Sequence, residues 1–293
     1  MDAADLRVFE AVARLGSMGR AAAALHTVQS NVTAHIRRLE DELGVALFRR
    51  HARGVEPTAP GMRLLPYAAE IAHLLEDARR AARDDGTPRG RLTIGSLETT
   101  AALRLPEKLA AFLGAFPEVD LMLRTGTTCE LVEQVLDHRL DGAFVCGPVA
   151  HPGLAAETMF SEELVLLAPP ALRSIDELLG RAEGRIVVLR LGCSYRQRLE
   201  DVLARRGVPA ARVLEFGTIE AILGCVSAGL GVTLLPAGMA GAPGRVSRHR
   251  LPPRDGRVET VFVRRREGYA PSALERFLAI VRAGGGEVRT AAE

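Results

Sequence analysis

The stretch that decides the fold is Ser17–Phe48, which reads SMGRAAAALHTVQSNVTAHIRRLEDELGVALF. Its apolar spacing predicts a helix over Met18–Leu25, a tight turn at His26–Thr27 and a second, longer helix. Ser17 is expected to cap the first helix and Thr27 the second, because a hydroxyl at a helix start can accept a backbone N–H bond. The stretch therefore predicts two helices joined by a short turn.

The second helix has two contrasting faces. Its apolar stripe recurs every three or four residues, at Val28, Val32, Ile36, Leu39 and Leu43. The opposite face is short, polar and sparsely charged, and such side chains near a helix start can reach base edges in a major groove. An ordinary helical hairpin with a solvated face is the alternative. The predicted DNA contacts of this helix are Gln29, Ser30, Asn31, Thr33, Ala34 and Arg37.

The segment Leu6–Tyr67 resembles the N-terminal domain of LysR-type transcriptional regulators, a winged helix-turn-helix. The matching residues are LRVFEAVARLGSMGRAAAALH and VQSNVTAHIRRLEDELGVALFRRHARGVEPTAPGMRLLPYA, and the resemblance continues through nearly all of the chain. The chain departs from the family at Val28, where Ser is usual, and at Ala34, where Arg is frequent. One DNA contact that the family implies is therefore absent. The VQSNVT variant resembles a subgroup related to regulators of glutamate synthase and putrescine utilisation.

After the second helix, the sequence FRRHARGVEPT over residues 48–58 predicts a short hairpin with Gly54 at its turn. This hairpin would be the wing. Its three arginines, Arg49, Arg50 and Arg53, are expected to contact backbone phosphates beside the groove. A solvated basic loop is the alternative.

A third long helix is predicted from Ala59 to about Arg83, capped by Thr58 and kinked or irregular at Pro66. Its apolar positions approach a heptad seam, which favours pairing with a second copy. Packing of this helix on its own domain is the alternative. The seam residues are Leu64, Ala68, Ile71, Leu75, Ala78 and Ala82.

From Arg91 onward, strands alternate with helices, which predicts α/β units. The expected strands are 92–97, 119–126, 141–147, 163–169, 185–190, 212–216, 231–236 and 258–266. The expected helices are 101–116, 129–138, 175–179, 195–206, 219–228 and 272–282, and the tail from Gly284 is expected to fray. The family resemblance implies a periplasmic-binding-protein-like effector domain of two lobes.

The predicted fold class is thus an α+β multidomain protein with three parts. These are a winged helix-turn-helix over 1–58, a linker helix and hinge over 59–90, and an α/β effector domain over 91–293. Within the effector domain, lobe I is expected at about 91–165 and 266–283, and lobe II at about 166–265.

Four strand-to-helix turns of this domain, two in each lobe, are rich in small hydroxyl side chains. Ligands of open parallel sheets bind at the carboxyl ends of strands, beside helix N-termini. Free N–H groups and hydroxyls suit a carboxylate, Arg196 would add positive charge, and Glu98 would suit an amino group. Ordinary helix capping is the alternative for each residue. The predicted effector-binding residues are Ser96, Glu98, Thr99, Thr100, Thr127, Thr128, Cys193, Ser194, Arg196 and Thr218.

Composition limits the remaining functions. The 293 residues carry a formal net charge of only +2, so DNA binding must come from local placement of charge. GxSxG, Walker A and HExxH motifs are absent, so neither an enzyme nor a cofactor is predicted. The four cysteines, Cys129, Cys146, Cys193 and Cys225, form no CxxC, which argues against zinc and favours buried thiols. The sequence shows no signal peptide and no apolar run of about 18 residues, which predicts a cytoplasmic protein without a membrane partner.

These features predict a transcription regulator that binds double-stranded DNA as a homodimer and responds to a small-molecule effector, either a small carboxylate or an amino acid. The family resemblance implies further assembly into a homotetramer, and RNA polymerase is a candidate partner. Two alternatives stay open at this point. One is a solute-binding protein or small enzyme with an incidental helical head, and the other is a regulator switched by thiols such as Cys193 and Cys225.

Overall fold

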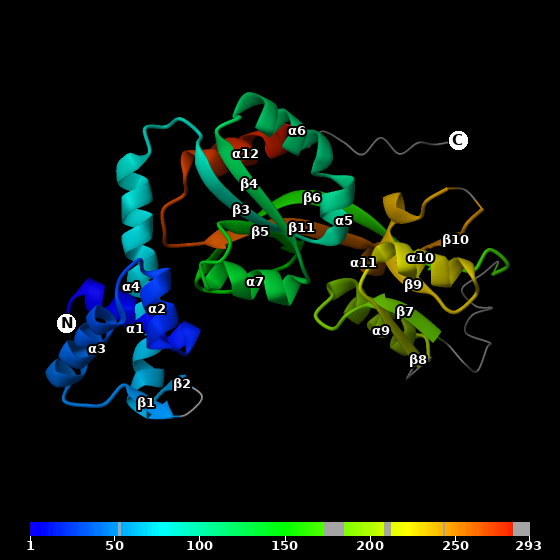
Figure 1. Cartoon of the computed structure of the whole chain (residues 1–293). Helices are drawn as coiled ribbons and strands as arrows, with labels where there is room; N and C mark the ends of the chain where they lie inside the picture. The colour runs from blue at the N-terminus through cyan, green and yellow to red at the C-terminus, as the bar shows by residue number, and fades with distance from the viewer. Residues whose placement is uncertain (52–53, 173–184, 208–211, 243, 284–293) are drawn as a thin grey trace. The chain divides into compact units, whose positions relative to one another are not determined.

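The computed structural model describes residues 1–51, 54–172, 185–207, 212–242 and 244–283 (Figure 1). The helix expected at 175–179 and the tail from Gly284 lie outside the described residues. The chain divides into two compact units, Met1–Asp84 and Asp85–Glu293. Among the described helices, none combines the length and the apolar composition that crossing a membrane requires.

The N-terminal unit contains the predicted helix-turn-helix and wing. Its elements are α1 (Ala3–Leu15), α2 (Met18–Ala24), α3 (Gln29–Leu43), the hairpin of β1 (Phe48–His51) and β2 (Gly54–Pro57), and α4 (Ala59–Arg83). Two predicted caps are confirmed, because the Ser17 hydroxyl accepts the Arg20 N–H and the Thr58 hydroxyl accepts the Gly61 N–H. Helix α3 ends at Gly44, whose φ of 68° lies in the left-handed region that favours glycine.

The start of α3 differs from the prediction. Val28 occupies the N-cap position and provides no side-chain hydrogen bond, while the Thr27 hydroxyl accepts a bond of 3.0 Å from Nδ2 of Asn31. The prediction that Thr27 caps α3 is therefore wrong, since its hydroxyl is used by a side chain instead of a backbone N–H. The apolar stripe is buried only in its middle, at Val32, Ile36 and Leu39, whereas its end residue Val28 is 64% exposed.

The wing and α4 are joined by hydrogen bonds to a short segment after α3. Oε1 of Glu40 accepts the Leu47 N–H at 2.7 Å, and the Thr58 N–H donates to the Leu47 carbonyl at 2.8 Å. Gly61, in the first turn of α4, lies against the same carbonyl. A Cβ at Gly61 would lie 2.3 Å from the Leu47 oxygen, so this position has no room for a side chain.

Helix α4 continues without interruption through Pro66, so the predicted irregular turn does not occur there. Leu64, Ala68 and Ile71 pack against the core of their own unit together with α1. The first half of the predicted seam therefore also serves the core of its own unit, with Ala68 fully buried and Leu64 and Ile71 partly buried. The exposed large apolar side chains of α4 are Met62 at 58%, Tyr67 at 65%, Leu74 at 54% and the seam residue Leu75 at 36%.

The effector unit contains a long mixed sheet whose strand order is β10-β6-β11-β5-β3-β4, with β9 also paired to β6. Strands β4 (Val119–Thr125) and β5 (Gly142–Cys146) both run parallel to β3 (Gly90–Ser96) between them. Helices α6 (Pro106–Ala115) and α12 (Ser272–Ala283) cover one face of this part of the sheet, and α7 (Thr128–Leu136) covers the other (Figure 1). This part is lobe I.

Two strands continue from lobe I toward lobe II. The first part of β6 (Leu154–Ala168) pairs with β11 (Arg257–Arg265), and its last residues pair with β9 (Thr233–Pro236) and β10 (Ser247–Arg250). Lobe II adds the parallel pair β7 (Arg185–Leu189) and β8 (Arg212–Phe216), with helices α9 (Ser194–Arg205) and α10 (Ile219–Ser227). Strands β6 and β11 therefore both contribute to the cores of the two lobes.

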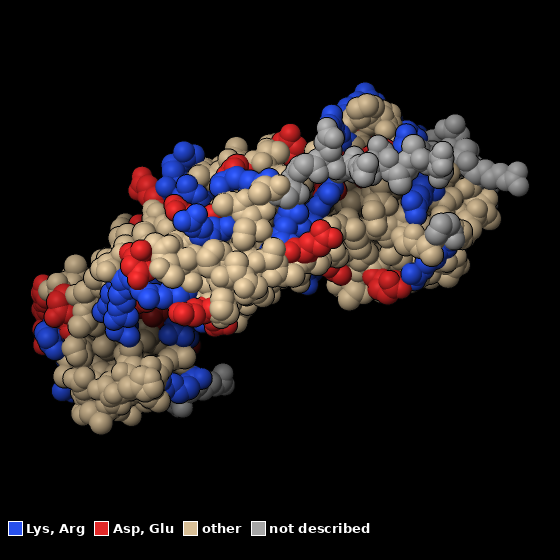
Figure 2. All heavy atoms as spheres, turned by 90° about the horizontal axis from the view of Figure 1, so that it is seen from above, with Lys and Arg blue, Asp and Glu red and all other residues tan. Residues whose placement is uncertain are grey.

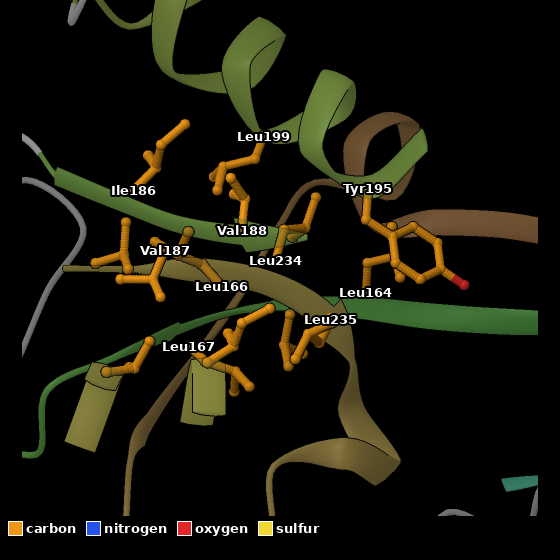
Figure 3. Close-up of a cluster of buried hydrophobic side chains, with 14 of the residues drawn as sticks. Leu164, Leu166, Leu167, Ile186, Val187, Val188, Tyr195, Leu199, Leu234 and Leu235 are labelled. Carbon is orange, nitrogen blue, oxygen red and sulfur yellow. The ribbon is translucent and has the colours of Figure 1, made fainter. Parts of the chain in front are cut away.

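The core of lobe II forms where these strands meet α9 (Figure 3). Leu164 and Leu166 of β6 lie with Val187 of β7 and Leu234 of β9 in one buried cluster. The ring of Tyr195, from the first turn of α9, lies beside this cluster, and its hydroxyl points away from it (Figure 3). The same side chain can therefore contribute apolar surface to the core and a polar atom outside it.

The effector unit departs from the sequence prediction at three places. The single helix expected over 101–116 is two helices, α5 (Glu98–Leu103) and α6, with Pro106 at the first position of α6, where its missing backbone N–H interrupts no helical hydrogen bond. Strand β6 begins at Leu154, well before the predicted 163, and the short β10, η1 (Ala237–Met239) and α11 (Pro253–Gly256) were not predicted. Val261–Val263 of β11 pack in the cores of lobe I, although the sequence placed them in lobe II.

We expect Gly61→Ala to destabilise the N-terminal unit. A methyl group 2.3 Å from the Leu47 carbonyl would force the backbone apart, and overpacking of this kind costs about 1–3 kcal/mol. Urea unfolding followed by circular dichroism measures the change. Gly19→Ala in α2 is the matched control, because its nearest contact is the flexible end of Gln29 at 3.5 Å, and we expect a change within about 0.5 kcal/mol. Equal stability of the two variants would contradict the close approach at Gly61.

Candidate DNA-binding face and effector cleft

The outer face of α3 is exposed to solvent along most of its length. Gln29, Ser30, Ala34 and Arg37 are exposed, and Thr33 is half-buried with its hydroxyl donating to the Gln29 carbonyl at 3.0 Å. Because Val32, Ile36 and Leu39 anchor the opposite side in the core, the face presents short polar groups and one guanidinium to the solvent. Such a surface can hydrogen-bond to base edges and phosphates.

Asn31 lies on a different flank of α3 from Gln29 and Thr33. Its side chain donates to Thr27, and it lines a cavity of about 330 Å³ with Arg7 of α1 and Arg79 of α4. The structure therefore places this predicted contact beside the neighbouring helices and away from the outer face.

A charged network that the sequence analysis missed fixes the orientation of α3. Asp5 of α1 is almost fully buried, and its Oδ1 lies 2.7 Å from Nδ1 of His35 and 3.7 Å from Nε of Arg38. A buried carboxylate is tolerated when it is paired and hydrogen-bonded. His35 and Arg38 are three residues apart and so share one side of the helix, which was the available signal. The network holds α3 to α1 without using the outer face.

The wing of the N-terminal unit, formed by β1 and β2, carries basic residues. Arg49 is exposed, whereas the side chain of Arg50 and the whole of Arg53 lie outside the part of the chain that the structure describes. Nε2 of His51 lies 3.3 Å from Oε1 of Glu56 on the paired strand. On the face of the molecule shown in Figure 2, Lys and Arg side chains are interspersed with Asp and Glu, in agreement with the small net charge.

A small cavity opens between the two lobes of the effector unit. Its volume is about 100 Å³, and both lobes contribute strand-to-helix turns to its wall. Four of the predicted effector-binding residues line it, namely Glu98, Thr99, Thr127 and Cys193. The other lining residues are Leu97, Thr125, Gly126, Leu189, Arg190, Tyr195 and Gly217. The carboxyl ends of strands from both lobes thus meet at one cavity, as the sequence pattern indicated.

The other six predicted residues do not line this cavity, and the structure gives most of them another partner. Ser96 and Thr100 are buried, and the Ser96 hydroxyl donates to the Leu97 carbonyl. The Thr218 hydroxyl caps α10 by accepting the Ala221 N–H. The Arg196 guanidinium donates to Glu200 at 3.0 Å and to Glu215 at 2.8 Å. Thr128 and Ser194 bond to each other across the lobes.

Four contacts join the lobes around the cavity. The hydroxyls of Thr99 and Tyr195 are 3.3 Å apart, and Ser194 Oγ donates to Thr128 Oγ1 at 3.0 Å. The Ile219 N–H, at the start of α10, donates to Oε1 of Glu98 at 3.3 Å. Nη2 of Arg190 donates to Oε2 of Glu130 at 3.0 Å. Burial raises the pKa of Tyr195 well above its usual value, so its hydroxyl stays protonated at neutral pH.

Among the residues that line the cavity, Glu98 and Arg190 carry opposite charges. Arg190 follows directly after β7, so the rule that ligands bind at the carboxyl ends of strands would have found it. Its partner Glu130 also completes a capping box at α7, because Oε2 of Glu130 accepts the Thr127 N–H at 2.8 Å. The Thr127 N–H, and after it Arg190, lowers the pKa of Glu130, which keeps this carboxyl ionised at neutral pH.

Of the four cysteines, only Cys146 is fully buried and Cys129 is exposed, so the expectation of buried thiols is wrong for Cys129. Burial raises the pKa of Cys146 and of Cys193, which disfavours the thiolate at neutral pH. Cys193 and the exposed Cys129 both border a second, larger cavity of about 550 Å³ that lies along α9 and includes Arg196 and Arg254. Within the described residues, no group of three or more His, Cys, Asp or Glu side chains is placed to hold a metal ion.

The chain is similar to known proteins along its whole length. Residues 3–62 match the family described as bacterial regulatory helix-turn-helix protein, lysR family, and residues 85–286 match the LysR substrate binding domain. The HTH-type transcriptional regulator GltR of Bacillus subtilis (strain 168) is 42% identical over 283 residues, which are 94% of this chain and 95% of that protein. The regulator YofA of the same organism is 43% identical over 281 residues, 95% of this chain and 97% of that protein.

Solved structures give the same result for the fold. Full-length CbnR in complex with its target DNA is 28% identical and has a TM-score of 0.62, covering 97% of this chain and 99% of that chain. ArgP from Mycobacterium tuberculosis, at 21% identity and a TM-score of 0.70, shares the fold over 98% of each chain.

An N-terminal helix-turn-helix with an open polar face and a two-lobed α/β unit with a cavity between its lobes agree with these similarities. The chain belongs to the LysR family of transcription regulators, as a DNA-binding protein with an effector-binding domain.

Proposed function

We propose that this regulator reads its operator through the outer face of α3 and holds the adjacent phosphates through its wing. The observation that carries the proposal is the uncovered polar face of α3, with Gln29, Ser30, Ala34 and Arg37 exposed beside a buried apolar stripe. In a dimer, two such helices would enter successive major grooves, and Arg49 would lie near the backbone. The protein acts on transcription and carries no enzymatic role in this proposal.

The homodimer is proposed to form along α4, on a strip that shares Ala78 with the predicted seam and adds Tyr67 and Leu74. Tyr67, Leu74 and Ala78 are exposed and are spaced by seven and four residues, so they share one side of the helix. Exposed apolar side chains in such a row favour pairing with a second copy. Further assembly into a tetramer through the effector units, and contact with RNA polymerase at the promoter, complete the proposed set of macromolecular partners.

The proposed effector is a small carboxylate or amino acid that binds in the cavity between the lobes. Hydroxyls of Thr99, Thr127 and Tyr195 and the charges of Glu98 and Arg190 face this cavity, and they suit a small polar ligand. Such a ligand shifts the balance between lobe arrangements only by binding one of them more tightly than the other. The cytoplasm, where small metabolites and the chromosome meet, is the proposed location.

We expect Arg37→Ala to weaken operator binding by about 1–3 kcal/mol if the guanidinium reads a guanine, with a loss of preference at one base pair. A phosphate contact would instead weaken binding to all sequences. Footprinting on the DNA beside the gene defines the operator, and fluorescence anisotropy measures the affinity. Arg139→Ala, which removes an exposed arginine paired with Asp137 in the effector unit, is the charge-matched control. Identical operator affinities of the two variants would show that the outer face of α3 does not contact DNA through Arg37.

Leu74→Glu is expected to shift the protein from dimer to monomer, since a carboxylate in the proposed strip would have to be buried against a second copy. Sedimentation velocity across a range of protein concentrations measures the shift. Met62→Glu is the control, because Met62 is similarly exposed on α4 but does not share the spacing of Tyr67, Leu74 and Ala78. A dimer of Leu74→Glu as tight as that of Met62→Glu would show that the copies pair through another surface.

A further inference from the structure

The two charged side chains that line the interlobe cavity have unused hydrogen-bonding capacity. Arg190 uses one Nη2 bond, to Glu130, and its side chain is 51% exposed. Glu98 uses one oxygen to accept the Ile219 N–H, and its other oxygen accepts no hydrogen bond from the residues that the structure describes. One cavity wall therefore offers a guanidinium edge and the other a carboxylate oxygen.

We propose that the cavity selects zwitterions of the α-amino acid type, with the ligand carboxylate on Arg190 and the ligand ammonium on Glu98. This inference rests on the proposed function of the cavity as the effector site. A planar guanidinium has a geometry that matches a carboxylate through paired N–H bonds. A cavity of about 100 Å³ corresponds to roughly three water molecules, which suits the compact head of an amino acid.

The two charges also act against ligands that carry only one of these groups. A simple carboxylate would bring its negative charge next to Glu98, and a simple amine would bring its positive charge next to Arg190. Specificity of this kind comes from repulsion of the wrong ligand as well as from attraction of the right one. The zwitterion alone pairs both charges.

The Arg190–Glu130 pair would be exchanged when the ligand binds. Both side chains are about half exposed, and ion pairs exposed to solvent contribute little to stability, so the pair is easily replaced. The exchange leaves α7 capped, because Glu130 keeps the Thr127 N–H on the same oxygen. Arg190 then exchanges its bond to Glu130 of lobe I for a bond to a ligand held between the lobes. Ligand binding is thereby coupled to a contact between the lobes.

Three isosteric variants separate these roles. Arg190→Gln removes the proposed carboxylate partner, and Glu98→Gln removes the proposed ammonium partner while keeping an oxygen for the Ile219 N–H. Glu130→Gln keeps the cap, which an amide can also provide, but removes the charge that competes for Arg190. Thermal unfolding of each variant verifies that the fold is intact.

The test is isothermal titration calorimetry of the full-length protein with the common L-amino acids and with matched compounds that lack the amino or the carboxyl group. L-Alanine, propionate and ethylamine form one such set. We expect at least one amino acid to bind at least tenfold more tightly than its matched carboxylate and amine. Arg190→Gln should weaken that binding at least tenfold, and Glu130→Gln should tighten it severalfold. Glu98→Gln should weaken binding of the amino acid and strengthen binding of the matched carboxylate.

The outcomes distinguish this inference from the function on which it rests. A carboxylate that binds the unaltered protein as tightly as its amino acid, with no response to Glu98→Gln, would overturn the zwitterion assignment and leave the cavity as an effector site. Binding that does not respond to Arg190→Gln would overturn the role of Arg190 in the same way. If no member of the panel gives heat or changes operator binding, both the inference and the proposed effector class are wrong.

Discussion

The first N–H groups of a helix need hydrogen-bond acceptors, and this need engages several of the polar side chains near the effector cavity. The first N–H groups of a helix have no partner within it, so hydroxyls and carboxylates from nearby supply one. Thr127 and Glu130 do so reciprocally at α7, and Thr218 does so at α10. Glu98 comes from the other lobe to accept the first N–H of α10, so one such bond also joins the lobes. The residues left over for a ligand are therefore fewer than the polar residues present.

The contacts between the lobes differ in strength, and this difference gives the unit a fixed part and a part that can change. Arg104 of lobe I donates two bonds, of 2.8 and 2.9 Å, to the nearly buried carboxylate of Glu162 on the strand shared by both lobes. A paired and buried charge of this kind is costly to separate. The Arg190–Glu130 pair at the cavity is half exposed and joined by a single hydrogen bond of 3.0 Å, so it is easier to exchange. In the proposed exchange, a ligand would act on the weaker of these contacts while the shared strand keeps its pairing.

In the DNA-binding unit, one set of α3 residues holds the helix in place and another set stays exposed. Val32, Ile36 and Leu39 bury one side, the Asp5 carboxylate binds His35 and Arg38 on a flank, and Glu40 joins the helix to the wing. These contacts use every side of α3 except the outer face. With a net charge of +2, the chain has little general attraction for DNA, so affinity depends on how firmly this face is positioned.

By itself, the sequence determined the elements and the family, because apolar periodicity, glycine and proline positions and helix caps act between residues close together in the chain. It located α2, α3, α4 and most strands of the effector unit, and it indicated that strand ends would form the ligand site. Only the tertiary structure decided which of the ten predicted residues line the cavity, and it added Arg190 and Tyr195. It also decided that Leu64, Ala68 and Ile71 of the predicted seam pack against the core of their own unit. These features rest on contacts such as Arg190 with Glu130 and Ile219 with Glu98, whose partners are 60 and 121 residues apart, and no local pattern specifies such pairs.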